Sequence, residues 1–296
     1  MSQILFGKNV AEKIYQEIEK DLRVLNFKKD KPILAIILIG NDPLCKKYIN
    51  LKVNKAKKLD IKIQVFQFPL IISQETIIAK IFDLNKSYKA KGIIVQFPLP
   101  KHIDANKVVW SIAPEKDVDG FQMRYFRPPA PMAIIDLLLH YKISVLKKKI
   151  ALIGYGALVG KPLATLLNKQ GANIYVYDKK NPINSFKIKQ ADIVISAVGV
   201  PKIITEDIVS KEQIIIDAGT SSEDNAIIGD VDYKNVEPIV KAITPVPGGI
   251  GIITVAELFR NFVKAYKLQS EKEAESSEKQ ERSANLNIAP FVKRKR

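Results

Sequence analysis

Residues 33–52 read ILAIILIGNDPLCKKYINLK and predict a strand, a short loop and a helix, in that order. Residues 33–40 form a continuous apolar run, which is typical of a buried parallel strand. Asp42 is a good N-cap and Pro43 suits the first helical position, so we expect the helix to begin there. Ligands of open α/β sheets bind beyond the carboxyl ends of such strands.

Tyr48 and Lys52 lie four residues apart on this predicted helix, so they share a face. A phenol and an amine just past the carboxyl end of a strand can transfer protons if the amine is desolvated. On spacing alone, an exposed pair without a chemical role is the more common arrangement. The pair becomes a candidate site only in combination with the rest of the chain.

The composition is that of an ordinary soluble globular protein, with 47% hydrophobic and 26% charged residues. A length of 296 residues is enough for two domains. The single cysteine, Cys45, excludes an intramolecular disulfide and fits a reducing compartment. Because there is no membrane-length apolar run and no signal-peptide pattern at the start, we expect a cytoplasmic protein without a membrane partner.

The formal net charge of +16 admits three interpretations: a nucleic-acid partner, an anionic small substrate, or a lysine-rich composition. The lysines are spread along the whole chain. This spread favours the compositional explanation, with some benefit to anionic ligands, over a nucleic-acid partner.

The second half of the chain alternates apolar strands with helices, which predicts a doubly wound parallel sheet. The predicted strands cover residues 149–153, 173–177, 191–199 and 213–219. A glycine-rich turn with Gly154, Gly156 and Gly160 follows the first of them and enters a helix, as in a dinucleotide-binding motif. Asp178 ends the next strand, where an acid binds ribose hydroxyls.

Three further segments carry chemical signals. Gln96 and a proline-rich loop follow the buried strand at residues 92–95, and a glutamine at that place needs a partner or a ligand. Residues 116–121 form an acidic turn closed by glycine. Residues 243–251 form a rigid turn that leads into the last predicted helix. The Glu/Lys/Ser-rich tail from Lys267 is expected to be disordered.

Together these motifs resemble the bifunctional methylenetetrahydrofolate dehydrogenase/methenyltetrahydrofolate cyclohydrolase family, from about Gly7 to about Tyr266. The resemblance rests on motifs that occur in the family order. They are YINLK (48–52), GIIVQFPLP (92–100), KDVDGF (116–121), the glycine-rich loop to Pro162, GDVD (229–232) and TPVPGG (244–249).

The resemblance implies an α/β fold of two domains with a cleft between them. Residues 1–141 with 251–266 would form the folate-binding catalytic domain, residues 142–250 a Rossmann-like nucleotide domain, and residues 267–296 a charged tail. It also implies a homodimer through the nucleotide domain and a role in one-carbon metabolism, tetrahydrofolate interconversion and purine biosynthesis.

The implied activities are oxidation of 5,10-methylenetetrahydrofolate by NAD(P)+ and hydrolysis of the methenyl product to 10-formyltetrahydrofolate. Lys52 would be the essential acid/base group and Gln96 its hydrogen-bonding partner. Tyr48 would pack along the folate rings, and Asp119 would bind the pterin edge, where a carboxylate accepts paired N–H donors. The excess of positive charge suits a folate that carries several glutamates.

The resemblance also implies two sets of binding residues and no metal. The expected substrate-binding residues are Tyr48, Gln96, Leu99, Asp119, Pro247, Gly248 and Gly249. The expected cofactor-binding residues are Gly154, Tyr155, Gly156, Val159, Gly160, Asp178, Val198, Gly199 and Thr220.

Three departures from the family pattern affect these expectations. Tyr155-Gly156 replaces the Arg-Ser pair that receives the 2′-phosphate of NADP, and Asp178 would repel that phosphate, so NAD becomes plausible where the family implies NADP. The segment between Phe121 and Pro128 is shortened and lacks the Asn-x-Gly-Arg-Leu piece. Ile252 replaces a proline in the last motif.

Other classes of function stay open at this stage. A cyclohydrolase without dehydrogenase activity and a non-catalytic folate- or nucleotide-binding relative are the alternatives. His102 and His140 lack the spacing of metal ligands, Cys45 lacks the pattern of a nucleophile, and Asp230 and Asp232 are assigned to a turn.

Overall fold

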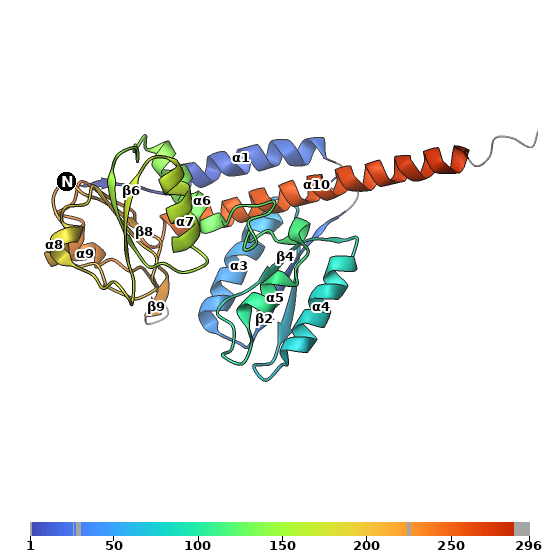
Figure 1. The fold of residues 1–296 in the computed structure, drawn as a ribbon, viewed down its shortest axis with the longest axis horizontal. Helices are drawn as coiled ribbons and strands as arrows, with labels where there is room; N and C mark the ends of the chain where they lie inside the picture. Colours follow the sequence, from blue (N-terminus) through green and yellow to red (C-terminus); the bar gives the residue numbers. More distant parts are fainter. Residues whose placement is uncertain (1, 26, 28–30, 224–225, 287–296) are drawn as a thin grey trace, which may run out of the picture.

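The computed structural model describes residues 2–286, apart from residues 26, 28–30 and 224–225, and forms two α/β units (Figure 1). The three-stranded unit contains β2 (Ile33–Ile39), β3 (Lys62–Phe68) and β4 (Ala90–Val95), in the order β3-β2-β4. The six-stranded unit has the order β1-β11-β8-β7-β5-β6. Its strands are β1 (Gln3–Ile4), β5 (Lys149–Ile153), β6 (Asn173–Tyr177), β7 (Ile193–Ser196), β8 (Ile214–Asp217) and β11 (Ala242–Ile243). All neighbouring strands in both sheets are parallel, which confirms the predicted fold class.

Helices surround both sheets. The three-stranded unit carries α3 (Pro43–Lys58), α4 (Gln74–Lys86), α5 (Ala105–Trp110) and the 3-10 turn η1 (Pro114–Lys116). The six-stranded unit carries α7 (Gly160–Lys169), α8 (Ser185–Ile188), η2 (Glu206–Ile208), α9 (Tyr233–Val236) and the hairpin of β9 (Ser221–Glu223) and β10 (Ala226–Ile228). The remaining helices are α1 (Lys8–Val24), α6 (Pro129–His140) and α10 (Ile250–Leu286).

The strand and helix predicted from residues 33–52 form as β2 and α3. Six of the seven residues of β2 are buried, as expected for the central strand of a sheet covered on both faces. Pro43 occupies the first turn of α3, and the Asp42 side chain accepts a hydrogen bond from the Cys45 amide at 2.8 Å. This cap fixes where α3 begins, so Tyr48 lies in its second turn and Lys52 in its third.

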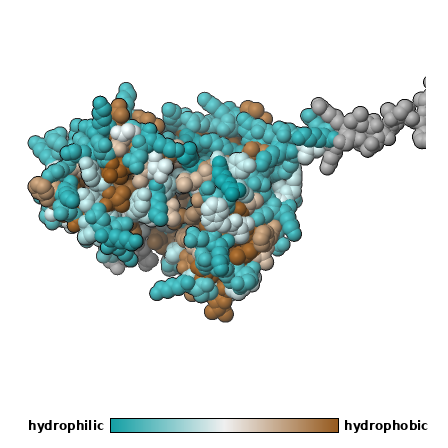
Figure 2. All heavy atoms as spheres, in the orientation of Figure 1, coloured by the Kyte–Doolittle hydropathy of each residue, from teal (hydrophilic) through white to brown (hydrophobic). Residues whose placement is uncertain are grey.

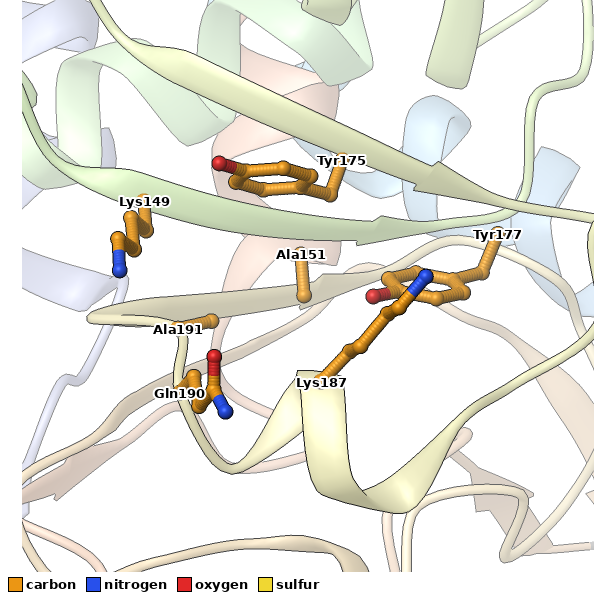
Figure 3. Close-up of a pocket in the computed structure, with 7 residues that line it drawn as sticks. All are labelled: Lys149, Ala151, Tyr175, Tyr177, Lys187, Gln190 and Ala191. Carbon is orange, nitrogen blue, oxygen red and sulfur yellow. The ribbon is translucent and has the colours of Figure 1, made fainter.

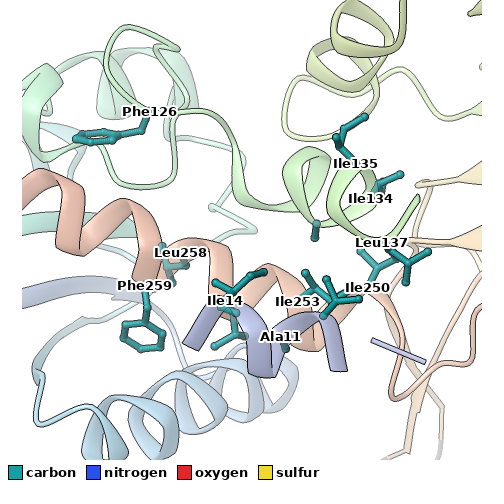
Figure 4. Packing of buried hydrophobic residues seen from close by; sticks show 14 of the residues in the cluster. Ala11, Ile14, Phe126, Ile134, Ile135, Leu137, Ile250, Ile253, Leu258 and Phe259 are labelled. Atoms are coloured by element: carbon teal, nitrogen blue, oxygen red, sulfur yellow. The ribbon is translucent and has the colours of Figure 1, made fainter. Parts of the chain in front are cut away.

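Helices α1, α6 and α10 pack against one another and join the two units (Figure 4). Their buried side chains belong to one apolar cluster that also includes Leu34 of β2 and Leu152 of β5. Because both sheets contribute to the same core, the free energy of burial holds the two units together.

Helix α10 departs from the prediction for residues 267–286. These residues were expected to be disordered, whereas α10 continues through Leu286. The buried Gln269 amide donates to the carbonyls of Lys91, Glu115 and Ala265, and Lys91 pairs with Glu273 at 2.6 Å. The contacts with Lys91 and Glu115 anchor the helix to the three-stranded unit. The Glu, Lys, Ala and Gln residues of this segment favour helix despite their low hydropathy. Residues 287–296, which include the rest of the predicted tail, lie outside the described residues.

The start of the chain also departs from the predicted domain boundaries. Residues 1–141 were assigned to the folate domain, but β1 pairs with β11 at the edge of the six-stranded sheet. The face shown in Figure 2 is mostly hydrophilic, with apolar atoms at the end of the three-stranded unit far from α10 and in smaller groups over the six-stranded unit. Among the described residues, no helix combines the length and apolar character that crossing a bilayer requires.

Candidate active site

Lys52 and Gln96 meet at the carboxyl edge of the three-stranded sheet. Gln96 follows β4 directly. Its backbone amide extends the sheet by donating a hydrogen bond to the carbonyl of Ile37 at 2.9 Å. Its side-chain nitrogen donates to the Phe97 carbonyl at 3.0 Å, so its side-chain oxygen accepts a hydrogen bond from Lys52 Nζ at 3.0 Å. The predicted partners are therefore in contact, with the amide orientation fixed by the chain itself.

The acidic turn that contains Asp119 lies beside this pair. Asp117 forms a bridge with Ile93 of β4, and its carboxylate accepts a hydrogen bond from the Gln122 amide at 2.8 Å. The rings of Phe97 and Phe121 pack with centroids 5.3 Å apart. These contacts join the loop after β4 to the acidic turn, which brings Asp119 close enough to interact electrostatically with Lys52.

Burial is the largest influence on the pKa values of Lys52 and Asp119. It lowers the pKa of Lys52 below the usual value for an amine, although Asp119 and Cys45 favour the charged form. Burial raises the pKa of Asp119 to about 6, against the opposing effect of Lys52. Burial thus favours the neutral amine of Lys52, while Asp119, with a pKa of about 6, still ionises at pH 7.

Tyr48 connects the two units. Its hydroxyl hydrogen-bonds with the side chain of Thr220, which follows β8 in the six-stranded unit. Burial raises the pKa of Tyr48, so its hydroxyl stays protonated at neutral pH. Because Thr220 was assigned to the cofactor and Tyr48 to the folate, this contact brings the two predicted sets of residues to one place.

The turn after β11 is tightly packed. Gly248 has a φ of +109°, which favours glycine, and its carbonyl accepts a hydrogen bond from the Gly7 amide at 2.9 Å. Pro247 is exposed, whereas Gly249 is buried, and a Cβ on Gly249 would lie 2.5 Å from the Pro245 carbonyl oxygen. Of the predicted substrate-binding residues here, Pro247 is thus accessible and Gly249 supports the turn.

Leu99, another predicted substrate-binding residue, lies on the loop after β4. Its half-buried side chain packs with Phe97 against the apolar cluster of β2, β4 and α4. This packing holds the proline-rich loop against the three-stranded unit.

The glycine-rich loop after β5 has the shape of a phosphate-binding turn. Gly154 has a φ of +96°, and a Cβ on Gly160 would lie 2.1 Å from the Gly154 carbonyl oxygen, so the loop folds directly onto the start of α7. A Cβ on Gly156 would meet no atom within 4 Å, which leaves space for a ligand. Tyr155 is 40% exposed at the same loop. A tight turn that opens a ten-residue helix suits a pyrophosphate, so these residues fit a dinucleotide.

Asp178 lies at the carboxyl end of β6, next to β5. Its Oδ1 accepts hydrogen bonds from the amides of Lys180 at 2.8 Å and Asn181 at 2.9 Å. These two bonds lower the pKa of Asp178, with the Asn181 amide contributing most, so the group is ionised at neutral pH. Val198 and Gly199 follow β7 on the other side of β5, which places the predicted nucleotide residues along one sheet edge.

Two features escaped the prediction. Asp217 and Asp230 are buried carboxylates behind the loops that contain Val198 and Thr220; Asp230 lies in a bend, as predicted, but its burial and its hydrogen bonds were not foreseen. Cys45 donates a hydrogen bond to the Phe97 carbonyl at 3.3 Å and lies close enough to Lys52 to affect its pKa. The GDVD motif and the position of Cys45 one turn before Tyr48 are the only sequence signals for them.

The remaining candidates stay apart from this site. Residues 2–286, so far as they are described, contain no cluster of three His, Cys, Asp or Glu side chains able to hold a metal. A hollow of about 190 Å³ on the six-stranded unit lies between β5, β6 and α8 (Figure 3). Its lining includes Tyr175, Tyr177 and Lys187 and no residue of the predicted active site.

Comparison with known proteins identifies both units. Residues 5–119 match the model of the tetrahydrofolate dehydrogenase/cyclohydrolase catalytic domain, and residues 128–270 match that of the NAD(P)-binding domain. The bifunctional protein FolD of Aquifex aeolicus is 40% identical over 280 residues, covering 90% of this chain and 96% of that protein.

Solved structures agree with the sequence comparisons. The bifunctional FolD enzyme of Campylobacter jejuni has a TM-score of 0.84 and 34% identity, covering 91% of this chain and 100% of that one. The Trypanosoma brucei dehydrogenase-cyclohydrolase, complexed with NADP and an inhibitor, has a TM-score of 0.83 and 27% identity, covering 91% of this chain and 98% of that one.

Proposed function

Because this chain belongs to the tetrahydrofolate dehydrogenase/cyclohydrolase family, we propose that Lys52, assisted by Gln96, carries the acid/base chemistry of its active site. The protein is a bifunctional enzyme. It oxidises 5,10-methylenetetrahydrofolate to the 5,10-methenyl form with NAD(P)+ and hydrolyses that product to 10-formyltetrahydrofolate. The observation that carries the assignment is the 3.0 Å hydrogen bond between Gln96 and a lysine whose pKa burial lowers.

The Lys52–Gln96 contact explains how an amine can serve as a base. A neutral amine has two hydrogens and one lone pair. When one hydrogen binds the Gln96 oxygen, the orientation of the lone pair is restricted. In the cyclohydrolase step, water adds to the methenyl carbon and Lys52 accepts its proton. The protonated amine then returns a proton to N5 as the bond from carbon to N5 breaks, and the hydroxyl proton leaves as the formyl group forms.

Tyr48 and Asp119 would orient the folate. At pH 7 the carboxylate of Asp119 is ionised, since its pKa is about 6, and it can accept two N–H donors from the pterin edge. The Tyr48 ring would pack along the folate, with its hydroxyl held by Thr220. The bound nucleotide would accept hydride from the one-carbon bridge, between these residues and the loops after β7 and β8.

We further propose that the enzyme prefers NAD. An ionised Asp178 repels a 2′-phosphate and can accept hydrogen bonds from ribose hydroxyls. Tyr155-Gly156 offers neither the guanidinium nor the serine hydroxyl of the Arg-Ser pair that receives the 2′-phosphate in the family pattern. The T. brucei relative was solved with NADP, so NADP is the alternative.

Two finer proposals concern partners. The family resemblance favours a homodimer through the six-stranded unit, which sedimentation of the purified chain would test. The net charge of +16 favours folates with several glutamates. A KM that falls with glutamate number and rises with salt would support that preference.

The decisive experiment follows the absorbance of the methenyl product, with 5,10-methylenetetrahydrofolate and either NAD or NADP. Turnover with NAD supports both the enzyme and the interpretation of Asp178, and turnover with NADP alone rejects that interpretation. Hydrolysis of the methenyl substrate without oxidation would leave a cyclohydrolase. Lys52→Met should abolish hydrolysis, and full activity of that variant would reject the role of Lys52.

A further inference from the structure

Asp230 is a buried carboxylate that bonds to the end of β7. It is fully buried, and its Oδ2 accepts hydrogen bonds from the Ser196 hydroxyl at 2.7 Å and from the Val198 amide at 2.8 Å. Both donors lie where β7 ends and the loop with Val198 and Gly199 begins. One carboxylate oxygen thus fixes the direction in which the chain leaves the sheet.

A second buried carboxylate, Asp217, holds the neighbouring segment. Its Oδ1 accepts hydrogen bonds from the amides of Gly219 at 2.9 Å and Asp230 at 3.1 Å, and its Oδ2 accepts one from Val231 at 2.9 Å. Burial raises the pKa of Asp217 to about 6. Asp217 therefore positions Asp230 itself, as well as the loop that leads to Thr220.

The backbone packs directly onto these carboxylates. A Cβ on Gly219 would lie 2.0 Å from Oδ1 of Asp230, and a Cβ on Gly229 would lie 2.0 Å from Oδ2 of Asp217. Such distances exclude any side chain at either glycine. The loops after β7 and β8 are thus held by hydrogen bonds and by close packing on the same two groups.

Stability alone does not account for this arrangement. Burying a carboxylate is costly, and Oδ1 of Asp230 has no hydrogen-bond partner in the described structure. An apolar side chain would avoid that cost but could not bind the Val198 amide. The cost is consistent with a functional demand on where that amide and its loop lie.

We infer that Asp230 is a positioning residue for the nucleotide. By holding Ser196 and the Val198 amide, it sets the loop of Val198 and Gly199 at the sheet edge where the nicotinamide half of the nucleotide binds. The inference rests on the proposed nucleotide site. It goes further by assigning the site's geometry to a buried acid that does not touch the ligand.

The two activities of the enzyme separate this role from a general effect on folding. The direct partners of Asp230 all belong to the six-stranded unit, whereas Lys52, Gln96 and Asp119 lie on the three-stranded unit. Loss of the Asp230 carboxylate should therefore impair use of the nucleotide and spare hydrolysis of the methenyl substrate, which needs no nucleotide.

The test compares Asp230→Ala, Asp230→Asn and the matched control Asp232→Asn in the full chain. Asp230→Ala should raise the KM for the nucleotide at least tenfold, with cyclohydrolase kcat/KM within twofold of wild type. Asp230→Asn can keep an oxygen at the place of Oδ2, so it should recover to within about threefold. Asp232 bonds to Asn235 at the surface, and its variant should match wild type in both assays.

The results for these variants either support or overturn the positioning role of Asp230. An unchanged nucleotide KM in Asp230→Ala, or an equal fall of both activities, would overturn the inference. Should Asp230→Ala fail to fold, Ser196→Ala removes one of the two bonds, and it should raise the nucleotide KM twofold to fivefold with hydrolysis intact. If wild type oxidises the substrate with neither NAD nor NADP, the proposed nucleotide site itself fails, and this inference with it.

Discussion

Gln96→Glu tests whether neutral Lys52 is the base. The substitution keeps the size of the side chain and replaces the acceptor 3.0 Å from Nζ with a carboxylate. At an effective dielectric constant of about 20, two unit charges at that distance attract by about 5.5 kcal/mol. Partial solvent exposure of both groups reduces this figure, and such neighbours typically shift a pKa by about 1 to 3 units. The pKa of Lys52 should therefore rise by that amount.

The assay is cyclohydrolase kcat/KM as a function of pH. If the neutral amine is the base, the alkaline shift lowers activity at pH 7 by about 10- to 1000-fold, because each pKa unit removes a factor of ten of the reactive form. Activity should return as the pH rises. Gln64→Glu adds the same charge at an exposed position of β3 and serves as the control. A profile of Gln96→Glu that stays within about 0.3 units of wild type would refute the reasoning.

Three further predictions concern the nucleotide, pH and α10. Asp178→Ser removes the charge that repels a 2′-phosphate, so the ratio of kcat/KM for NADP to that for NAD should rise at least tenfold; a constant ratio would reject the assignment. Burial raises the pKa of Glu257, a residue of α10 that lies 2.6 Å from Arg260, so the folded state holds a proton that the unfolded chain releases. The free energy of unfolding should thus fall as the pH rises above the ordinary carboxyl range, and urea titrations at several pH values should show a flatter fall for Glu257→Gln. Gln269→Ala leaves the carbonyls of Lys91 and Glu115 without this donor and should lower the free energy of unfolding by about 1 to 3 kcal/mol; an unchanged urea midpoint would show that these bonds do not anchor α10.

Local signals account for the parts of the fold that could be predicted. Asp42 and Pro43 set the start of α3 because capping depends only on neighbours in the chain. The apolar run of β2 predicted a buried parallel strand, because this pattern too depends only on neighbours in the chain. The contact between Lys52 and Gln96 followed from the family resemblance, and from the rule that parallel strands end at one edge of their sheet.

The end of α10 marks the limit of such reasoning. Composition predicted disorder after Lys267, because the segment has too few apolar residues to form a core of its own. The helix is instead anchored by Gln269, whose amide reaches carbonyls of β4 and η1 that lie more than 150 residues away in the chain. No local pattern encodes partners at that separation.

The sequence by itself thus determined the order of strands and helices and the family, and it singled out Lys52 as the proposed acid/base group, since each depends on local periodicity or on a motif. Only the tertiary structure decided that Tyr48 meets Thr220 across the two units and that Asp230 holds the loop after β7. Both contacts join residues from separate elements. They exist only after both sheets have packed on α1, α6 and α10 and excluded water from the groups between them.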